Sequence, residues 1–130
     1  MAQLDMIGIV VDDMAAALKF YRLLGVDVPE GAEAEDHVEV RTNGYRVAWD
    51  TRAVILSFDP DWTPPAGPSR GLGLAFLCAD PADVDATYQR LTAAGYSSRK
   101  APWDAFWGQR YAQVSDPDGN PVDLFAPLGG

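Results

Sequence analysis

The chain has 130 residues, and its composition of 48% hydrophobic and 22% charged residues is typical of one soluble globular domain. The chain has 10 Lys and Arg but 19 Asp and Glu, which gives a net charge of −9. This charge argues against a nucleic-acid partner, because the phosphate backbone is also negative. No apolar run approaches the roughly 20 residues that span a bilayer. We also expect no secretory signal, and Cys78 has no second cysteine to pair with. These features predict a cytoplasmic protein without a membrane partner.

The first half of the chain predicts a strand, a helix and three further strands. An apolar run over Leu4–Val11 indicates the first strand, and Asp13 can cap the helix that follows. Apolar residues at helical spacing predict that helix over Met14–Leu24, and Gly25 stands where a helix ends. A hairpin turn is indicated at Asn43-Gly44. The three further strands are expected over His37–Thr42, Tyr45–Trp49 and Ala53–Phe58.

A proline-rich segment, DPDWTPPAGPSR over residues 59–70, follows and is typical of a linker. Beyond it the pattern predicts a strand over Gly71–Ala79. Asp80 then caps a helix that ends at Gly95, and a short strand is expected over Tyr96–Arg99. The chain closes with a predicted hairpin, whose strands Gln109–Val114 and Val122–Ala126 flank the turn signal Asp116–Asn120.

The two halves show the same order of elements at a constant offset. Three pairs of like residues are 67 positions apart (for example 80 − 13), namely Asp13 and Asp80, Phe58 and Phe125, and Pro60 and Pro127. Such a repeat indicates a duplicated module, although coincidence among common residues is the alternative. We therefore predict an α+β fold of two tandem βαβββ modules in a single domain over residues 1–130. The modules cover about 1–58 and 71–127, and form a curved mixed sheet with helices outside and a concave ligand cleft.

Three segments resemble the vicinal-oxygen-chelate superfamily, which includes glyoxalases, bleomycin-resistance proteins, extradiol dioxygenases and fosfomycin-modifying enzymes. They are VVDDMAAALKFYRLLG over residues 10–25, ADPADVDATYQRLTAAG over residues 79–95 and WGQRYAQVSDPDGNPVDLF over residues 107–125. The resemblance covers nearly the whole chain. It implies paired modules with a ligand on the concave face, and it leaves the chemistry open because this fold carries several activities.

The resemblance implies that a divalent metal, where present, is held by His and Glu at first-strand and last-strand positions. These positions fall on Met6 and Gly73 in the first strands, and on Leu56 and Asp123 in the last strands. A thioether suits only soft ions, and Leu56 and Gly73 offer no donor, so Asp123 alone keeps a carboxylate. The only histidine, His37, lies at none of these positions and is expected at the surface or a strand edge. We therefore expect no metal and no cofactor.

What remains resembles the bleomycin-resistance-like branch, whose members sequester a drug in a groove, commonly as homodimers. Flat aromatic rings near the last hairpin are candidates to stack on a planar or cationic ligand. Asp123 would share their face of the sheet, and only one of Arg110 and Tyr111 can do so because neighbours on a strand alternate. The candidate ligand-binding residues are Trp49, Trp103, Phe106, Trp107, Arg110, Tyr111 and Asp123.

Two functions are therefore compatible with the sequence. The first is a metal-independent, homodimeric binding protein for an aromatic or cationic small molecule, such as an antibiotic. The second is a lyase, isomerase or dioxygenase-type enzyme of the same superfamily, in which Asp123 acts as a general base or as a metal ligand. A domain with a vestigial cleft is the third and plainest alternative.

Overall fold

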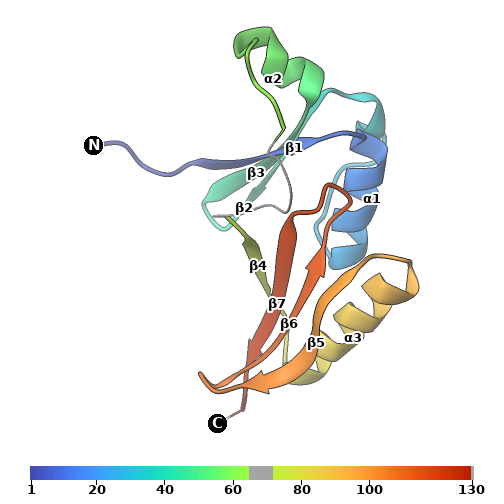
Figure 1. Cartoon of the computed structure of the whole chain (residues 1–130). Coiled ribbons are helices and arrows are strands. Elements are labelled where there is room, and N and C mark those ends of the chain that lie inside the picture. Colours follow the sequence, from blue (N-terminus) through green and yellow to red (C-terminus); the bar gives the residue numbers. More distant parts are fainter. Residues whose placement is uncertain (65–71, 130) are drawn as a thin grey trace. The chain divides into compact units, whose positions relative to one another are not determined.

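The computed structural model describes residues 1–64 and 72–129, and its contacts divide the chain into two compact units, Met1–Pro64 (unit 1) and Pro65–Gly130 (unit 2) (Figure 1). The predicted linker over 59–70 falls partly outside the described residues, as does Gly71, and the predicted module and linker boundaries stay predictions. No helix in the described ranges is long and apolar enough to cross a membrane. Within the described residues each unit combines one mixed sheet with at least one helix, which confirms the predicted α+β class.

Unit 1 begins with the strand and the helix that the sequence predicts. Asp13 caps α1 by accepting a hydrogen bond from the Ala16 amide, and Gly25 ends the helix with a φ of 123°. The sheet has the order β1-β3-β2, with β1 parallel and β2 antiparallel to β3. The elements are β1 (Met6–Val11), α1 (Met14–Leu24), the 3-10 helix η1 (Ala32–Ala34), β2 (His37–Thr42), β3 (Tyr45–Thr51) and α2 (Arg52–Phe58).

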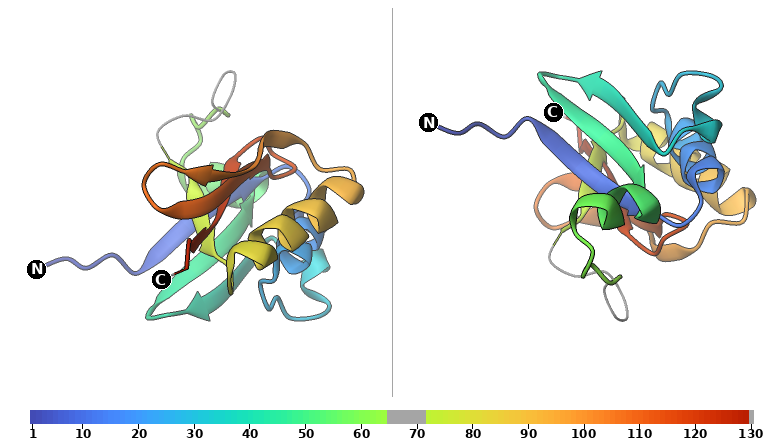
Figure 2. Two further views of the ribbon diagram at one scale, coloured as in Figure 1. Left: turned by 90° about the horizontal axis from the view of Figure 1, so that it is seen from below. Right: turned by 90° about the horizontal axis from the view of Figure 1, so that it is seen from above.

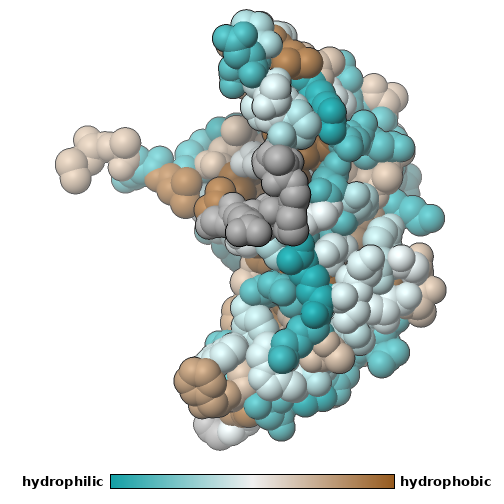
Figure 3. All heavy atoms as spheres, in the orientation of Figure 1, coloured by the Kyte–Doolittle hydropathy of each residue, from teal (hydrophilic) through white to brown (hydrophobic). Residues whose placement is uncertain are grey.

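The strand predicted over Ala53–Phe58 is wrong, because this segment forms the helix α2. The Val and Ile residues of the segment favour a strand, but a strand needs a partner for its backbone groups, and β3 already holds the place beside β1. A helix satisfies those backbone groups within the segment itself. None of its residues is buried, and Figure 3 shows hydrophobic atoms gathered over α2.

The helix α2 also changes which residues of the two predicted modules are equivalent. Asp13 and Asp80 are equivalent, because each caps a helix that follows the first strand of its unit. Phe58 and Phe125 are not equivalent, because Phe58 ends α2 whereas Phe125 lies in a strand. The strand register shows instead that Ala48 on β3 takes the place of Asp123, since Ala48 lies opposite Gly8 as Asp123 lies opposite Ala75. The offset of 67 therefore holds for the first strand and helix, but not for the last strands.

Unit 2 has a complete four-stranded sheet with the order β4-β7-β6-β5. The helix α3 packs against one face of this sheet, over β6 and β7 (Figures 1 and 2). That face is fully buried at Val114, Val122 and Leu124, and α3 contributes Val84 and Leu91 to the same core. The elements are β4 (Leu74–Leu77), α3 (Pro81–Ala93), β5 (Ser98–Ala105), β6 (Gln109–Ser115) and β7 (Pro121–Pro127).

The turn between β6 and β7 is built around the buried carboxylate of Asp116. One oxygen of Asp116 accepts hydrogen bonds from the backbone amides of Asp118 and Asn120 at 2.9 and 2.8 Å. The other oxygen accepts a hydrogen bond of 2.9 Å from the side-chain amide of Asn120. Gly119 supplies the positive φ, at 83°, that the tight turn requires. This turn fixes the register of β7 against β6.

We expect Asp116→Ala to lower the free energy of unfolding by about 2–3 kcal/mol, because it leaves the turn amides without their acceptor. Denaturant unfolding of the variant and the parent protein measures this loss. Asp61→Ala, which removes an exposed aspartate in unit 1, is the matched control and should have almost no effect. Equal losses in the two variants would contradict the role given to the turn.

One face of the unit 1 sheet carries a chain of charged groups. Nδ1 of His37 lies 2.5 Å from the buried Asp50 carboxylate, and Nε2 lies 3.3 Å from Glu39. Arg46 continues the chain by donating hydrogen bonds to Glu39 and to Asp5. The hydrogen bond to Asp50 is the main reason that the pKa of His37 is raised, and the charges of Asp50 and Glu39 add to it while burial opposes it. His37 thus lies on the edge strand β2, as expected, but it is held by neighbouring carboxylates.

The raised pKa means that the folded protein binds the His37 proton more tightly than the unfolded chain does. The resulting stabilisation is complete below the unfolded pKa of about 6.5. It is lost as the pH rises through the higher folded pKa. His37→Gln should therefore reduce the free energy of unfolding more at about pH 5.5 than at about pH 8.5. Urea unfolding at the two pH values checks this, and a His37 pKa at or below 6.5 in a proton NMR titration would refute it.

Candidate ligand site on the four-stranded sheet

Strand alternation in unit 2 separates a packed face from an open face. Val122, Leu124 and Ala126 of β7 are fully buried on the α3 side, so Asp123 and Phe125 point to the opposite side. We call this opposite side the open face. By strand register it carries the side chains of Ala75, Leu77, Lys100, Trp103, Tyr111, Gln113, Asp123 and Phe125.

The alternation also shows which of Arg110 and Tyr111 lies on the open face. The guanidinium of Arg110 donates hydrogen bonds of 3.0 and 3.2 Å to the two carboxylate oxygens of Asp85 on α3, and a third of 3.1 Å to Asp104. Arg110 is therefore engaged on the helix side of the sheet, where it ties β6 to α3. Tyr111 lies on the open face, so the structure separates Arg110 from the other predicted ligand-binding residues.

Asp123 is held at the centre of the open face by two neighbours on β6. The hydroxyl of Tyr111 donates a hydrogen bond of 2.5 Å to one carboxylate oxygen, and the side-chain amide of Gln113 donates one of 2.7 Å to the other. Burial, the hydrogen bond to Asp123 and the charge of Asp123 together raise the pKa of Tyr111 to about 12. The phenol therefore stays protonated at neutral pH and remains a donor to the carboxylate.

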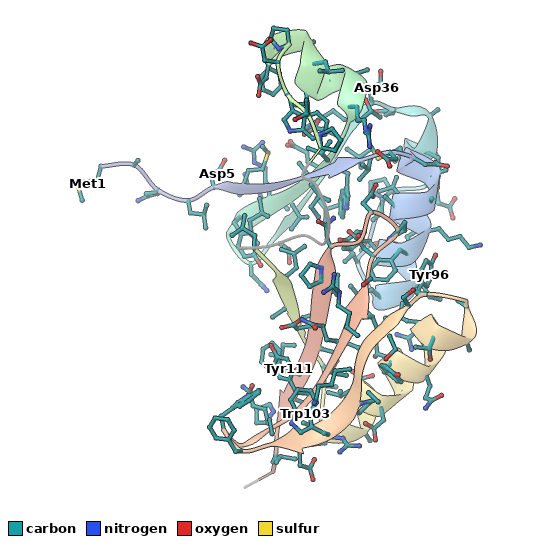
Figure 4. The ribbon with its side chains drawn as sticks, in the orientation of Figure 1. Met1, Asp5, Asp36, Tyr96, Trp103 and Tyr111 are labelled. Atoms are coloured by element: carbon teal, nitrogen blue, oxygen red, sulfur yellow. The ribbon has the colours of Figure 1, made fainter. Side chains whose placement is uncertain are left out.

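Three aromatic rings lie beside this carboxylate, from β5, β6 and the turn between them. The ring centroids of Trp103 and Trp107 lie 5.5 and 5.4 Å from that of Tyr111, and 5.9 Å from each other. All three pairs meet edge to face, with interplanar angles of 65°, 79° and 89°. Phe125 extends the cluster, with its ring stacked at 27° to that of Tyr111. Figure 4 shows Trp103 and Tyr111 close together on this sheet.

One ring of the aromatic cluster, that of Trp103, lies on a longer strand than the sequence predicts. The short strand predicted over Tyr96–Arg99 is in fact β5, which continues to Ala105, so Trp103 lies in a strand and not in a loop. Pro102 and register shifts between Ser98 and Trp103 interrupt the apolar alternation, and this hides the strand from a sequence pattern. Phe106 and Trp107 form the turn to β6, where Phe106 is almost fully exposed and Figure 3 shows a hydrophobic projection.

Trp49 does not belong to this group. It lies on β3 of unit 1, is fully buried, and packs its ring 5.3 Å from that of Tyr21 on α1. A large aromatic residue in a central strand is typically a core residue, and this is the case here. The burial of Trp49 in the core of unit 1 argues against the predicted contact with a ligand.

The residues at the predicted metal positions do not suit a metal ion. Leu56 lies on α2 and not on a last strand, Gly73 has no side chain, and Met6 on β1 offers only a thioether. The carboxylate of Asp123 is already bonded to Tyr111 and Gln113. Within residues 1–64 and 72–129, no three His, Cys, Asp or Glu side chains converge as a metal site requires.

Two polar residues of the open face, Gln113 and Lys100, were not singled out in the sequence. Gln113 bonds Asp123, and the Lys100 ammonium lies 4.6 Å from the centroid of the Trp103 ring. Alternation along β6 is the signal for Gln113, because it stands two residues from Tyr111. Lys100 has no comparable signal, since its partner ring depends on the irregular register of β5.

Comparisons with known proteins agree with this architecture. A family model described as Glyoxalase/Bleomycin resistance protein/Dioxygenase superfamily matches residues 3–124. An uncharacterised protein of Mycobacterium bovis is 32% identical over 127 residues, which cover 92% of this chain and 80% of that protein.

Solved structures give the same result for the fold. A glyoxalase/bleomycin resistance protein/dioxygenase family enzyme from Burkholderia phytofirmans has a TM-score of 0.81 at 22% identity, with 98% of this chain and 100% of that chain covered. A lactoylglutathione lyase from Agrobacterium tumefaciens has a TM-score of 0.68 at 21% identity, with 97% and 94% covered. The chain belongs to the Glyoxalase/Bleomycin resistance protein/Dioxygenase superfamily.

Proposed function

We propose that this protein binds an aromatic small molecule on the open face of unit 2 without using a metal. The observation that carries the proposal is the half-exposed cluster of Trp103, Trp107 and Tyr111 beside the hydrogen-bonded carboxylate of Asp123. Monomeric proteins seldom leave such a cluster at the surface unless it contacts something. Sequestration of an antibiotic or another aromatic or cationic metabolite would use this surface.

The spacing of the rings indicates how a ligand would be held. Centroids 5.4 to 5.9 Å apart, in edge-to-face contact, leave no room for a group between Trp103, Trp107 and Tyr111. A ligand would therefore stack on an outward ring face instead of entering a cage. Trp107 is the best-placed ring for this, because it is 48% exposed and its indole N–H is fixed by a hydrogen bond of 2.9 Å to Gln109.

Asp123 would supply the polar contact of the site. An ionised carboxylate has about four lone-pair positions. Tyr111 and Gln113 use two of them, and both of those donors come from β6 on one side of Asp123. The remaining positions can accept a hydrogen bond from a cationic or N–H group of a ligand that stacks on the neighbouring rings.

An enzymatic function is the second candidate, and the Tyr111–Asp123 pair is the observation that favours it. A protonated phenol 2.5 Å from a carboxylate is an arrangement that can give and receive a proton. One structural neighbour is a lactoylglutathione lyase, and another is a glyoxalase-related enzyme from Fulvimarina pelagi. We place binding first because, among the other open-face groups named above, only Lys100 can transfer a proton, and its ammonium lies over the Trp103 ring. A homodimeric assembly and a cytoplasmic location are parts of the same proposal.

A pair of variants tests the proposed site with two indole probes, the cation tryptamine and the neutral indole-3-acetamide. Asp123→Asn should weaken tryptamine about tenfold and leave the amide little changed, because it removes a charge-assisted hydrogen bond. Trp107→Ala should weaken both probes about threefold to tenfold, because both lose the stacking surface. Isothermal titration calorimetry measures the affinity of each probe for the parent protein and for both variants.

Asp61→Asn and Phe58→Ala are matched controls, since they remove an exposed carboxylate and an exposed ring from unit 1. The affinities should also be unchanged when a chelator is present. Equal losses of both probes in Asp123→Asn, or no loss in Trp107→Ala, would show that the site is elsewhere. A requirement for a divalent metal would favour the enzymatic alternative.

A further inference from the structure

Lys100 places a positive charge on the open face, at the outer strand β5. Its ammonium lies 4.6 Å from the centroid of the Trp103 ring, a distance typical of a cation–π contact. The side chain is exposed, and in the part of the chain that the structure describes no carboxylate lies within ion-pair distance of it. This cation therefore faces the aromatic cluster, although the chain as a whole has a net charge of −9.

The strand register arranges the open face as two rows that cross the sheet. Lys100, Gln113 and Asp123 are opposite one another on β5, β6 and β7 and form a polar row. The second row is apolar and aromatic, and it consists of Trp103, Tyr111, Phe125 and Leu77. Two strand spacings of about 4.8 Å put the backbones of Lys100 and Asp123 roughly 10 Å apart. Each end of the polar row thus carries one charge, and the charges have opposite sign.

The two charged ends do not neutralise each other. The Asp123 carboxylate is hydrogen-bonded to Tyr111 and Gln113, and the Lys100 ammonium lies over the Trp103 ring. Gln113 stands between Asp123 and Lys100 in the polar row. The ammonium stays charged in the cation–π contact, which holds it over Trp103. The centroid of the Trp103 ring is 5.9 Å from that of Trp107, the ring on which a ligand would stack. An anionic group attached to that ligand would therefore meet a positioned positive charge, although the field of the whole chain is negative.

We infer that the ligand is an aromatic molecule that carries an anionic group, such as a carboxylate or a phosphate, in addition to the cationic or N–H group that meets Asp123. Lys100 is then the residue that determines specificity for the anion. This inference rests on the proposed function of the open face. It narrows the ligand class from aromatic small molecules to aromatic molecules with both an acidic group and a donor.

The test compares two probes with one ring system, the anion indole-3-acetate and the neutral indole-3-acetamide, by calorimetry on the full chain. The parent protein should bind the anion more tightly relative to the amide than Lys100→Met does, by about threefold to fivefold. Lys100→Arg should keep the preference, because it keeps the charge. Lys19→Met, which removes the other lysine of the chain from α1, is the control for net charge and should leave the ratio unchanged. The preference should also decrease as salt is raised from about 0.05 to 0.5 M.

The outcomes separate the inference from the proposed function. If the amide binds and Trp107→Ala weakens it, but Lys100→Met leaves the ratio of anion to amide affinity unchanged, then the open face binds ligands and the role of Lys100 is wrong. An equal change in Lys19→Met would also overturn the inference, because the effect would be one of net charge. If neither probe binds, or if Trp107→Ala has no effect, the proposed function fails and the inference fails with it.

Discussion

The alternation of β7 is the constraint on which the candidate site depends. Val122, Leu124 and Ala126 are buried against α3, and a slip of one residue would expose all three and bury Asp123 and Phe125. Burial of three apolar side chains and the cost of burying an ionised carboxylate therefore favour the same register. The carboxylate of Asp116 secures that register at the turn, through its bonds to Asp118 and Asn120. The packing of the core thus places the acidic group of the site on the open face.

The same alternation of side chains explains why the sheets of the two units present different chemical groups. In unit 2 the face away from α3 combines a carboxylate with large rings, and Asp123 receives its hydrogen bonds from uncharged donors. In unit 1 the place of Asp123 is taken by Ala48, and the surrounding positions form the charged chain of His37, Asp50 and Glu39. Those groups satisfy one another by hydrogen bonds and ion pairs. The charged chain of unit 1 thus presents paired ionic groups, whereas the open face of unit 2 presents aromatic rings beside a carboxylate.

The sequence predicts most of the fold because local chemistry determines it. Helix caps at Asp13 and Asp80 and the turns at Asn43-Gly44 and Asp116 are all found in the structure. The errors arise where partners outside the segment decide. Residues 53–58 have strand propensity, but β3 takes the place beside β1 and the segment forms a helix. Trp49 packs on Tyr21 of α1, which the pattern of its own strand does not show.

The site itself could be predicted only in part. The alternating pattern of β7 predicts that Asp123 points to the face away from Val122 and Leu124. It therefore predicts one acidic side chain with aromatic rings nearby. It could not choose between Arg110 and Tyr111, because that choice depends on Asp85 of α3. It also missed Lys100, because the irregular pairing of β5 brings its ammonium over Trp103. Contacts that depend on register between strands are not visible in a single strand.

An NMR titration of the full chain with tryptamine shows whether an aromatic ligand binds the open face. The indole N–H signals of Trp103 and Trp107 and the side-chain amide of Gln113 report on the open face, whereas the indole N–H of Trp49 reports on the buried core of unit 1. If an aromatic ligand binds the open face, the first three signals shift in a saturable way and the Trp49 signal does not move. Shifts at Trp49 with none at Trp103, Trp107 and Gln113 would contradict binding at this face.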